Sequence, residues 1–148
     1  MLGRLASGHQ VEGPGVVAPI TASSYLDGVS PGGLRSHLRD VFDELWIVDL
    51  GGEGRGARAD ENVFAIRTPV TIAFGIRTGG PRKGCEVRYL AVEGTRDEKL
   101  AQLGKLDLLG APVAAIEGTG LARLTPVSAA EYHEWPETSD PSRWSSQA

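Results

Sequence analysis

Cysteine, histidine and methionine are scarce in this sequence, and the scarcity excludes several kinds of chemistry. The only cysteine among 148 residues is Cys85, so the chain cannot form an internal disulfide or a site built from several thiolates. The histidines, His9, His37 and His133, are far apart and give no pair at metal-ligand spacing. Walker loops and nucleophile elbows are also absent. The sequence therefore shows no complete catalytic constellation.

Long hydrophobic runs are missing as well. The longest apolar runs extend over about six to seven residues, far fewer than the ~20 needed to cross a bilayer. The first residues, MLGRLASGHQ, contain no apolar signal-peptide segment. We therefore expect a soluble, cytoplasmic protein with no membrane partner. With 41% hydrophobic residues, the chain is long enough for one domain with a core of ordinary size.

A basic excess is confined to the middle of the chain. Residues 1–50 carry three basic and six acidic side chains, residues 51–90 carry seven and four, and residues 91–148 carry five and nine. Arginine suits bidentate contact with phosphate or guanine, although charged loop residues are more often simply solvated. Both interpretations stay open for the middle segment. Its basic residues are Arg55, Arg58, Arg67, Arg77, Arg82, Lys83 and Arg88.

Three consecutive segments predict a β-α-β unit. The β-branched run VVAPI at 16–20 predicts a strand, with Pro19 at its end or near a sheet edge. A helix is expected over 31–43, and LWIVDL at 45–50 predicts a buried strand. Such a unit normally joins two parallel strands through a right-handed crossover. We therefore expect an α/β fold.

The helix predicted over 31–43 has the pattern of an amphipathic surface helix. Ser30 is placed to cap it, and Pro31 suits its first position because a proline there loses no hydrogen bond. Apolar residues recur at helical spacing, which predicts that one face packs on the sheet. These are Leu34, Leu38, Val41 and Phe42. The other faces are expected to hold Arg35, Arg39, Asp40 and Asp43.

The following segments predict a mixed sheet. VTIAFGIR at 70–77 has the pattern of a central strand, and the lack of an intervening helix favours an antiparallel return after 45–50. A turn-rich stretch at 78–84 and the alternating CEVRYLAVEG after it predict a further hairpin. A short capped helix is expected from Thr95 to near Gly104. The last part of the chain is expected to be a smaller, irregular α+β extension.

The loop between the two central strands contains a weak nucleotide-binding pattern. Gly52, Gly54 and Ala57 match G-x-G-x-x-A, which in dinucleotide-binding folds admits a pyrophosphate to a helix N-terminus. That site needs a helix next, whereas GARADENVFAIRTPV has no helical stripe and contains Pro69. A long connection of glycines and arginines fits the pattern better, and a nucleotide-binding enzyme remains the third hypothesis.

Five short motifs follow one another in residues 15–77. They are a strand ending in a small-Ser-Tyr-Leu turn, an "LR..L" helix, an "I.DLG" strand, the tripeptide "NVF" and a strand preceded by Thr-Pro. In this order they resemble the later half of the catalytic domain of amino-group adenine DNA methyltransferases, most closely type ISP and related fused restriction–modification enzymes. The motifs lie at Ile20–Leu26, Leu34–Leu38, Ile47–Gly51, Asn62–Phe64 and Thr68–Ile76.

The resemblance implies a partial Rossmann-like methyltransferase sheet, with a parallel β-α-β unit and a terminal antiparallel hairpin. It also implies a role for Phe64. In related enzymes the aromatic residue just before the last strand lies against the flipped target adenine, and Phe64 stands at the matching position. A core-covering role is the alternative for this side chain. Arg55, Arg58 and Arg67 are the candidates for contact with DNA.

The family also binds S-adenosylmethionine through a glycine-containing turn and places the target amino group against an Asn/Asp-Pro-Pro-Tyr/Phe turn. Neither motif is present, and both would lie upstream of Met1. We therefore expect a fragment, inactive alone and unable to bind the cofactor alone, that works with DNA and a missing N-terminal portion or partner chain. Its expected parts are a tail at 1–14, the catalytic-domain portion at 15–92 and an extension at 93–148.

A second hypothesis comes from another class of function. The chain is then a small nucleic-acid-binding or protein-interaction module that uses the arginine-rich region 55–88. It predicts DNA affinity that falls steeply with salt.

Overall fold

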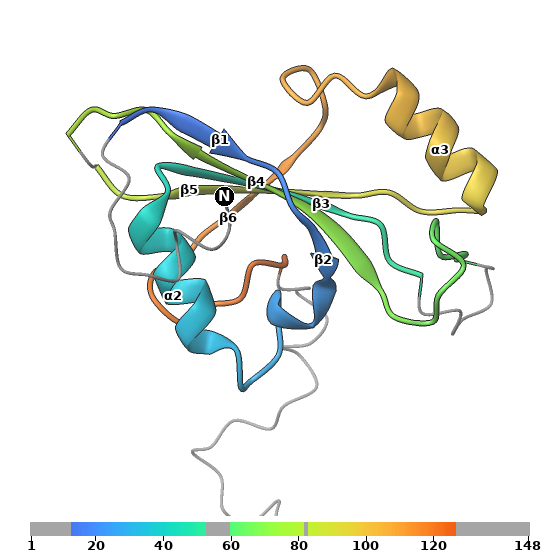
Figure 1. Ribbon diagram of the computed structural model, residues 1–148, viewed down its shortest axis with the longest axis horizontal. Helices are drawn as coiled ribbons and strands as arrows, with labels where there is room; N and C mark the ends of the chain where they lie inside the picture. The colour runs from blue at the N-terminus through green and yellow to red at the C-terminus, as the bar shows by residue number, and fades with distance from the viewer. Residues whose placement is uncertain (1–12, 53–59, 82, 127–148) are drawn as a thin grey trace, which may run out of the picture.

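A computed structural model describes residues 13–52, 60–81 and 83–126. In this part of the chain, six strands form a single sheet, with one helix on each face (Figure 1). A single 3-10 turn, η1, follows β2. The elements in chain order are β1 (Gly15–Val17), β2 (Ile20–Ala22), η1 (Ser23–Tyr25), α2 (Gly32–Val41), β3 (Glu44–Asp49), β4 (Val70–Arg77), β5 (Glu86–Ala91), α3 (Arg96–Lys105) and β6 (Ala114–Ile116).

The sheet is mixed, as predicted. Its strand order is β1-β4-β3-β5-β6, and β2 also pairs with β4. The antiparallel return from β3 to β4 is confirmed, with Trp46 opposite Phe74 in the register. Only the pair of β3 and β5 is parallel among the strands described. The predicted α/β class with a mixed sheet is therefore correct, and Pro19 lies at the edge of the sheet, between the short strands β1 and β2.

The parallel partner of β3 differs from the prediction. β1 and β2 pair antiparallel with β4, and so does β3. The strand at 16–20 and the strand at 45–50 consequently run in the same direction, but they are not neighbours. β4 separates them because both of its edges are used: the Ala73 amide donates to the Pro19 carbonyl on one side, at 3.1 Å, and the Leu50 amide donates to the Val70 carbonyl on the other, at 3.0 Å.

The hairpin predicted across residues 78–84 is wrong. β5 pairs in parallel with β3, with Leu45 opposite Val87, instead of turning back along β4. The free edge of β3 is the available one, because β4 is already paired with β1 and β2 on its other side. The chain therefore passes across the end of β3 between β4 and β5.

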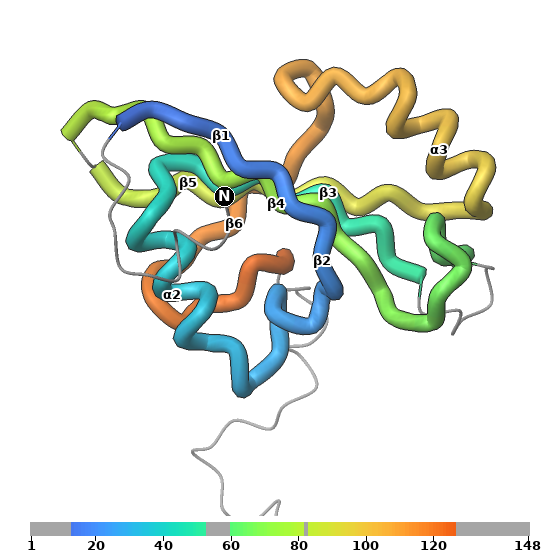
Figure 2. Tube along the Cα trace, viewed as in Figure 1, coloured from blue at the N-terminus to red at the C-terminus, as the bar shows by residue number. Residues whose placement is uncertain are grey.

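The sheet separates two hydrophobic clusters. Because successive strand residues point to opposite faces, Leu45 and Ile47 belong to one cluster and Val48 to the other. The first cluster lies on the α2 side and includes Leu124, which is fully buried. The second lies on the α3 side, where residues of the α3 region pack against it. Figure 2 shows α2 and the chain after β6 on one side of the strands and α3 on the other.

The side chains that helix α2 buries differ from the predicted ones. It begins at Gly32, its N-cap is Pro31, and no side-chain hydrogen bond caps it, so Ser30 does not have the predicted role. Leu34 is 46% exposed, whereas Arg35 and Arg39 are 5% and 6% exposed. The arginines are buried because their guanidinium groups meet backbone carbonyls.

We call Arg35 and Arg39 the arginine anchor. Arg35 donates from Nε and Nη2 to the Leu121 carbonyl, at 3.1 and 3.0 Å, and from Nη1 to two carbonyls near η1. Arg39 donates to the carbonyls of Gly120, Ala122 and Arg123 at 2.7–3.0 Å. Four consecutive carbonyls, 120–123, are thus bound to α2. This contact places Leu124 in the core.

Helix α3 confirms the capped helix predicted after Thr95. The Thr95 side chain accepts a hydrogen bond from the Glu98 amide, and the Glu98 carboxylate accepts one from the Thr95 amide, which is a complete capping box. These hydrogen bonds lower the pKa of Glu98 below its ordinary value. Within the described ranges, neither helix has the length and apolar composition needed to cross a membrane.

Candidate functional site

Residues 60–69, which we call the lip segment, form the second described part of the connection between β3 and β4, after residues 50–52. They leave the sheet at the carboxyl end of β3, beside the start of α3 (Figure 1). The segment buries Val63, which is 7% exposed, but leaves Phe64 47% exposed and Ile66 48% exposed. The sequence placed Phe64 either over the core or at a binding surface, and the structure shows a half-exposed side chain.

A buried lysine fixes the start of the lip segment. Lys99 on α3 has no exposed surface, and its Nζ lies 2.5 Å from the Asp60 carboxylate. The same Nζ donates to the Leu50 carbonyl at 2.5 Å and to the Glu61 carbonyl at 2.8 Å. All three ammonium donors therefore have an acceptor, as a buried charge requires. We call Lys99 and Asp60 the lysine anchor.

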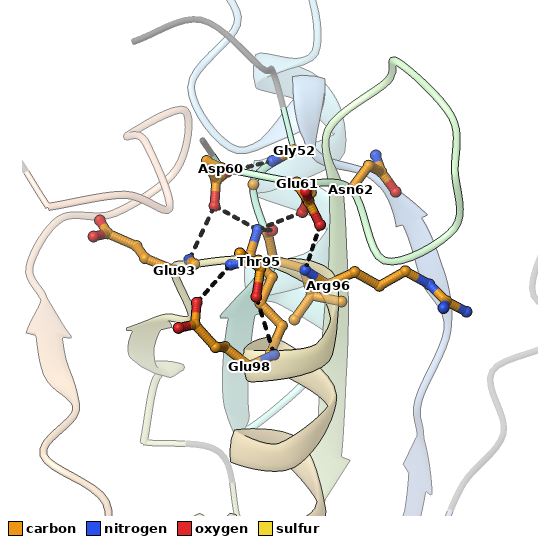
Figure 3. Close-up of polar contacts among 12 residues, drawn as sticks. Gly52, Asp60, Glu61, Asn62, Glu93, Thr95, Arg96 and Glu98 are labelled. Carbon is orange, nitrogen blue, oxygen red and sulfur yellow. Dashed lines mark hydrogen bonds and ion pairs between the residues drawn. The ribbon is translucent and has the colours of Figure 1, made fainter. Parts of the chain in front are cut away.

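Asp60 connects this anchor to the glycines after β3. Its Oδ2 accepts from the Gly52 amide at 2.6 Å, and Oδ1 faces the Gly94 amide at 3.4 Å. Burial raises the pKa of Asp60, but the hydrogen bond from Lys99 and those from the two amides outweigh it, so the pKa lies below its ordinary value. The carboxylate is thus stabilised in its charged form. Figure 3 shows Asp60 between Gly52 and the start of α3.

The contact between Asp60 and Gly52 also bears on the G-x-G-x-x-A pattern noted in the sequence. Gly51 and Gly52 have φ angles of 55° and 103°, which favour glycine. The Gly52 amide donates to Asp60 within the chain, so it does not point at an open phosphate cradle. Gly54 and Ala57 lie outside the described residues. The described part of the pattern therefore serves the fold of the loop.

The first turn of α3 holds the middle of the lip segment. The Arg96 amide, one of the amides without a partner inside the helix, donates to the Glu61 carboxylate at 2.9 Å. The Arg96 side chain donates from Nε to the Val63 carbonyl, also at 2.9 Å. Figure 3 shows Glu61 directly above Arg96. Helix α3 therefore supports three successive parts of the lip segment, at residues 60, 61 and 63.

The predicted DNA-contact arginines are only partly placed. Arg67 is exposed and lies in the lip segment, three residues from Phe64. Arg55 and Arg58 lie outside the described residues. The structure does not gather the other described arginines of the basic region at the lip, because they contact their own strands and helix.

Arg88 and Arg77 illustrate those internal contacts. Arg88 lies 2.5 Å from Glu44 and 2.6 Å from Glu86, and its guanidinium stacks over the Trp46 ring at 4.6 Å from the centroid. Arg77 donates to the Val41 carbonyl at 3.1 Å. Within the described part of the region 55–88, fewer arginines are thus available for DNA contact than their number in the sequence indicates.

Sequence reasoning missed Lys99, Asp60 and Arg96, which build the support of the lip segment. The capping box revealed where α3 begins, and that signal placed Arg96 in the first turn. Nothing in the spacing marked Lys99 as buried, because its acceptors come from residues 38 and 49 positions away in the chain. Long-range backbone acceptors leave no local pattern.

Two other features lie apart from the lip. Tyr89 donates to the Asp49 carboxylate at 2.7 Å, and burial together with this bond raises the tyrosine pKa.

An open cavity of about 460 Å³ lies at the start of β3, near Asp43, Thr78 and Cys85. Among residues 13–52, 60–81 and 83–126, no group of three or more acidic, histidine or cysteine side chains is placed to hold a metal ion.

Most of this chain is similar to parts of solved structures of enzymes bound to DNA. The ATP-dependent Type ISP restriction-modification enzyme LlaBIII bound to DNA is 26% identical over 81% of this chain, with a TM-score of 0.69. The chain is similar to a type ISP enzyme. A nuclease-deletion mutant of the Type ISP enzyme LlaGI, in complex with a DNA substrate mimic, is 27% identical over 77% of this chain, with a TM-score of 0.66.

The third similar structure is the DrdV–DNA complex, which is 26% identical over 81% of this chain, with a TM-score of 0.68. This chain spans only 9–12% of the three longer chains. No family model matches the sequence, and no curated protein matches it. The similarity therefore supports the resemblance to type ISP enzymes noted from the motifs, over most of the described residues.

Proposed function

We propose that this chain forms the target-base side of an adenine-specific, S-adenosylmethionine-dependent DNA methyltransferase of a restriction–modification system. Two of the similar structures are Type ISP restriction-modification enzymes, and all three hold DNA or a DNA mimic. This context supports DNA as the partner of the present chain. Adenine as the target base comes from the motif resemblance at Asn62–Phe64.

The observation that carries the proposal is the exposure of Phe64 on an anchored segment. An aromatic side chain that is 47% exposed, next to a valine that is 7% exposed, gains little from the core. A base extruded from a duplex loses its stacking partners, and an aromatic face restores about 1–3 kcal/mol per base. Because the lysine anchor and α3 fix the segment beneath it, Phe64 would meet the base with little loss of backbone freedom.

The other roles follow from charge and position. Arg67, exposed in the same segment, is suited to a DNA phosphate near the extruded base. Arg55 and Arg58 are proposed for the same backbone contact on the basis of sequence alone. These contacts would position the DNA without selecting its sequence.

We propose that the glycine turn after β3 does not bind S-adenosylmethionine. In this turn the Gly52 amide donates its hydrogen bond to the Asp60 carboxylate, so it is not available to a cofactor. We propose that the cofactor belongs to the intact enzyme and that residues outside this chain bind it. The present chain then contributes to base binding and does not transfer a methyl group by itself.

The test is a binding experiment with the full 148-residue chain and two labelled duplexes. One duplex is fully paired, and the other carries one adenine opposite an abasic site, which lowers the cost of extruding it. We define the adenine preference as the ratio of the two dissociation constants, measured by fluorescence anisotropy. The wild-type chain is expected to prefer the unpaired adenine, and Phe64→Ala should lower the preference by roughly 5- to 150-fold, up to complete loss.

Leu109→Ala is the matched control. Leu109 is 88% exposed but lies after α3, outside the lip segment, so its truncation should leave the adenine preference unchanged. A wild-type chain without any adenine preference would refute the proposal. An unchanged preference in Phe64→Ala would refute the role of this side chain.

A further inference from the structure

The Asn62 side chain makes two hydrogen bonds in the lip segment, one with Phe64 and one with Thr68. Its Oδ1 accepts a hydrogen bond from the Phe64 amide at 2.9 Å. Its Nδ2 donates to the Thr68 carbonyl at 2.7 Å. The second bond joins residues six positions apart, so it closes the lip segment into a loop with Phe64 inside it. One side chain thus sets both the local turn and the width of this loop.

The backbone at this turn needs such support. Ala65, directly after Phe64, has a φ of 54°, which is unfavourable for a residue with a β-carbon. Conformations of this kind persist only where the surrounding contacts fix them. The Asn62 carbonyl accepts from the Ala65 amide at 3.4 Å, in addition to the two side-chain bonds. Asn62 therefore makes three hydrogen bonds at this turn, and Arg96 adds one to the Val63 carbonyl.

Asn62 is itself held in place from the β3 side. A β-carbon on Gly52 would lie 2.7 Å from Nδ2 and 2.9 Å from Cβ of Asn62, which is too close for any side chain. Glycine at position 52 thus lets Asn62 sit directly against the backbone after β3. The amide of the same Gly52 donates a hydrogen bond to the carboxylate of Asp60 in the lysine anchor. The asparagine is consequently fixed relative to the sheet.

From these contacts we infer that Asn62 is the positioning residue for Phe64, holding the aromatic ring outward for the extruded base. This inference rests on the proposed function, because it assigns the ring a base as its partner. Without the Asn62 side chain, the turn loses its two side-chain hydrogen bonds, and the half-exposed ring gains freedom to move. Positioning before binding lowers the entropy lost on binding, so Asn62 should affect base affinity without contacting the base.

The experiment uses the full chain as wild type, Asn62→Ala and Asn62→Asp, with two readouts. The first readout is the hydrogen-exchange rate of the Phe64 amide, measured by NMR. The second is the adenine preference defined above. Asn62→Ala removes both side-chain bonds, and we expect the Phe64 amide to exchange a few-fold to about tenfold faster, the range for one lost hydrogen bond. The adenine preference should fall in the same variant.

Asn62→Asp keeps an oxygen that accepts from the Phe64 amide but replaces the donor to the Thr68 carbonyl. It should retain most of the Phe64 protection and show an adenine preference between those of wild type and Asn62→Ala. Gln102→Ala is the matched control, because Gln102 also donates an amide hydrogen bond to a carbonyl, that of Glu93 at 3.1 Å, but lies on α3. It should change neither readout.

The outcomes separate this inference from the proposed function. Unchanged Phe64 exchange in Asn62→Ala overturns the inference, whatever the DNA result. Faster exchange with an unchanged adenine preference also overturns it, because the ring would then bind equally well without positioning. If the wild-type chain shows no adenine preference, the proposed function fails, whereas faster exchange in Asn62→Ala still supports Asn62 as the residue that fixes Phe64.

Discussion

The arginine anchor and the lysine anchor hold loops against opposite faces of the sheet by different chemistry. The arginines of α2 bind carbonyls at 120–123 and near η1, and they place Leu124 in the core. Lys99 of α3 binds a carboxylate as well as two carbonyls, and it fixes the segment that presents Phe64. The first anchor completes the fold, whereas the second also supports the candidate site.

This difference has a consequence for function. Loss of the arginine anchor should lower stability and leave the lip segment unchanged, because its acceptors lie on the other face of the sheet. Loss of the lysine anchor should lower stability less and loosen the lip segment directly. Variants of the two anchors therefore separate the stability of the whole chain from the order of its candidate site.

Arg35→Met tests the arginine anchor and should have the largest effect. Methionine replaces the aliphatic part of the side chain but leaves the carbonyls of Leu121, Tyr25 and Gly28 without their donor. We expect the free energy of unfolding to fall by about 4 kcal/mol, measured by urea denaturation, because several part-buried acceptors lose their partner together. The exchange rate of the Phe64 amide should not change under native conditions.

Arg123→Met is the control for this experiment. The Arg123 side chain is exposed, and only its carbonyl contacts the anchor, so the substitution should change stability by less than about 0.5 kcal/mol. A loss of under about 1 kcal/mol in Arg35→Met would show that water replaces the guanidinium at little cost.

The anchors also show which parts of the fold were predictable. The β-branched runs at 45–50 and 70–77 and the capping box at Thr95 gave the right elements, because strand alternation and helix capping are local properties. The buried arginines were predicted to face outward. Their acceptors lie up to 86 positions away, so helical periodicity contained no information about them.

The candidate site was predictable to a smaller degree. The motif resemblance singled out Phe64, and the basic middle of the chain supplied Arg67 as a candidate for DNA contact. Both side chains are exposed in the lip segment. The order of the strands was not predictable in full, because an α-β crossover does not reveal that β4 will insert between the strands it joins. The support of the lip segment depends on backbone carbonyls, which every sequence has, and so only the folded chain reveals it.

Lys99→Met tests the lysine anchor and should have the second largest effect. The substitution leaves the Leu50 and Glu61 carbonyls without a donor and Asp60 without its cation. We expect a loss of about 3 kcal/mol in the free energy of unfolding, less than for Arg35, because the Asp60 side chain is 34% exposed and water can solvate it. Unlike Arg35→Met, this variant should also accelerate exchange of the Phe64 amide.

Lys105→Met is the control within the same helix. Lys105 is exposed in the last turn of α3, so its loss should be worth less than about 0.5 kcal/mol and should not affect the lip segment. The comparison of the anchors fails if Arg35→Met and Lys99→Met accelerate Phe64 exchange equally, since the two faces of the sheet would then be coupled.

The smallest expected effect is the pH dependence of the stability that the lysine anchor provides. The contacts described for the arginine anchor are to backbone carbonyls, which do not titrate, so they should not share it. Burial raises the pKa of Asp60, but the hydrogen bonds from Lys99 and from the Gly52 and Gly94 amides, together with the charge of Lys99, outweigh burial, so the pKa in the folded chain lies below its ordinary value of 3.8. Its contribution is therefore fully present above about pH 4 and is lost as the pH falls through the lower folded value.

Thermal unfolding of wild type and Asp60→Asn from pH 7 to pH 2 measures this contribution. Asparagine does not titrate, so the difference in stability, about 1 kcal/mol or less for a carboxylate that is a third exposed, should be constant down to about pH 4 and shrink below it. Glu98, whose pKa is also lowered, titrates in both chains and cancels in the difference. A difference that stays constant down to pH 2 would mean that the Asp60 charge adds nothing, and that the carbonyl bonds of Lys99 alone hold the lip segment.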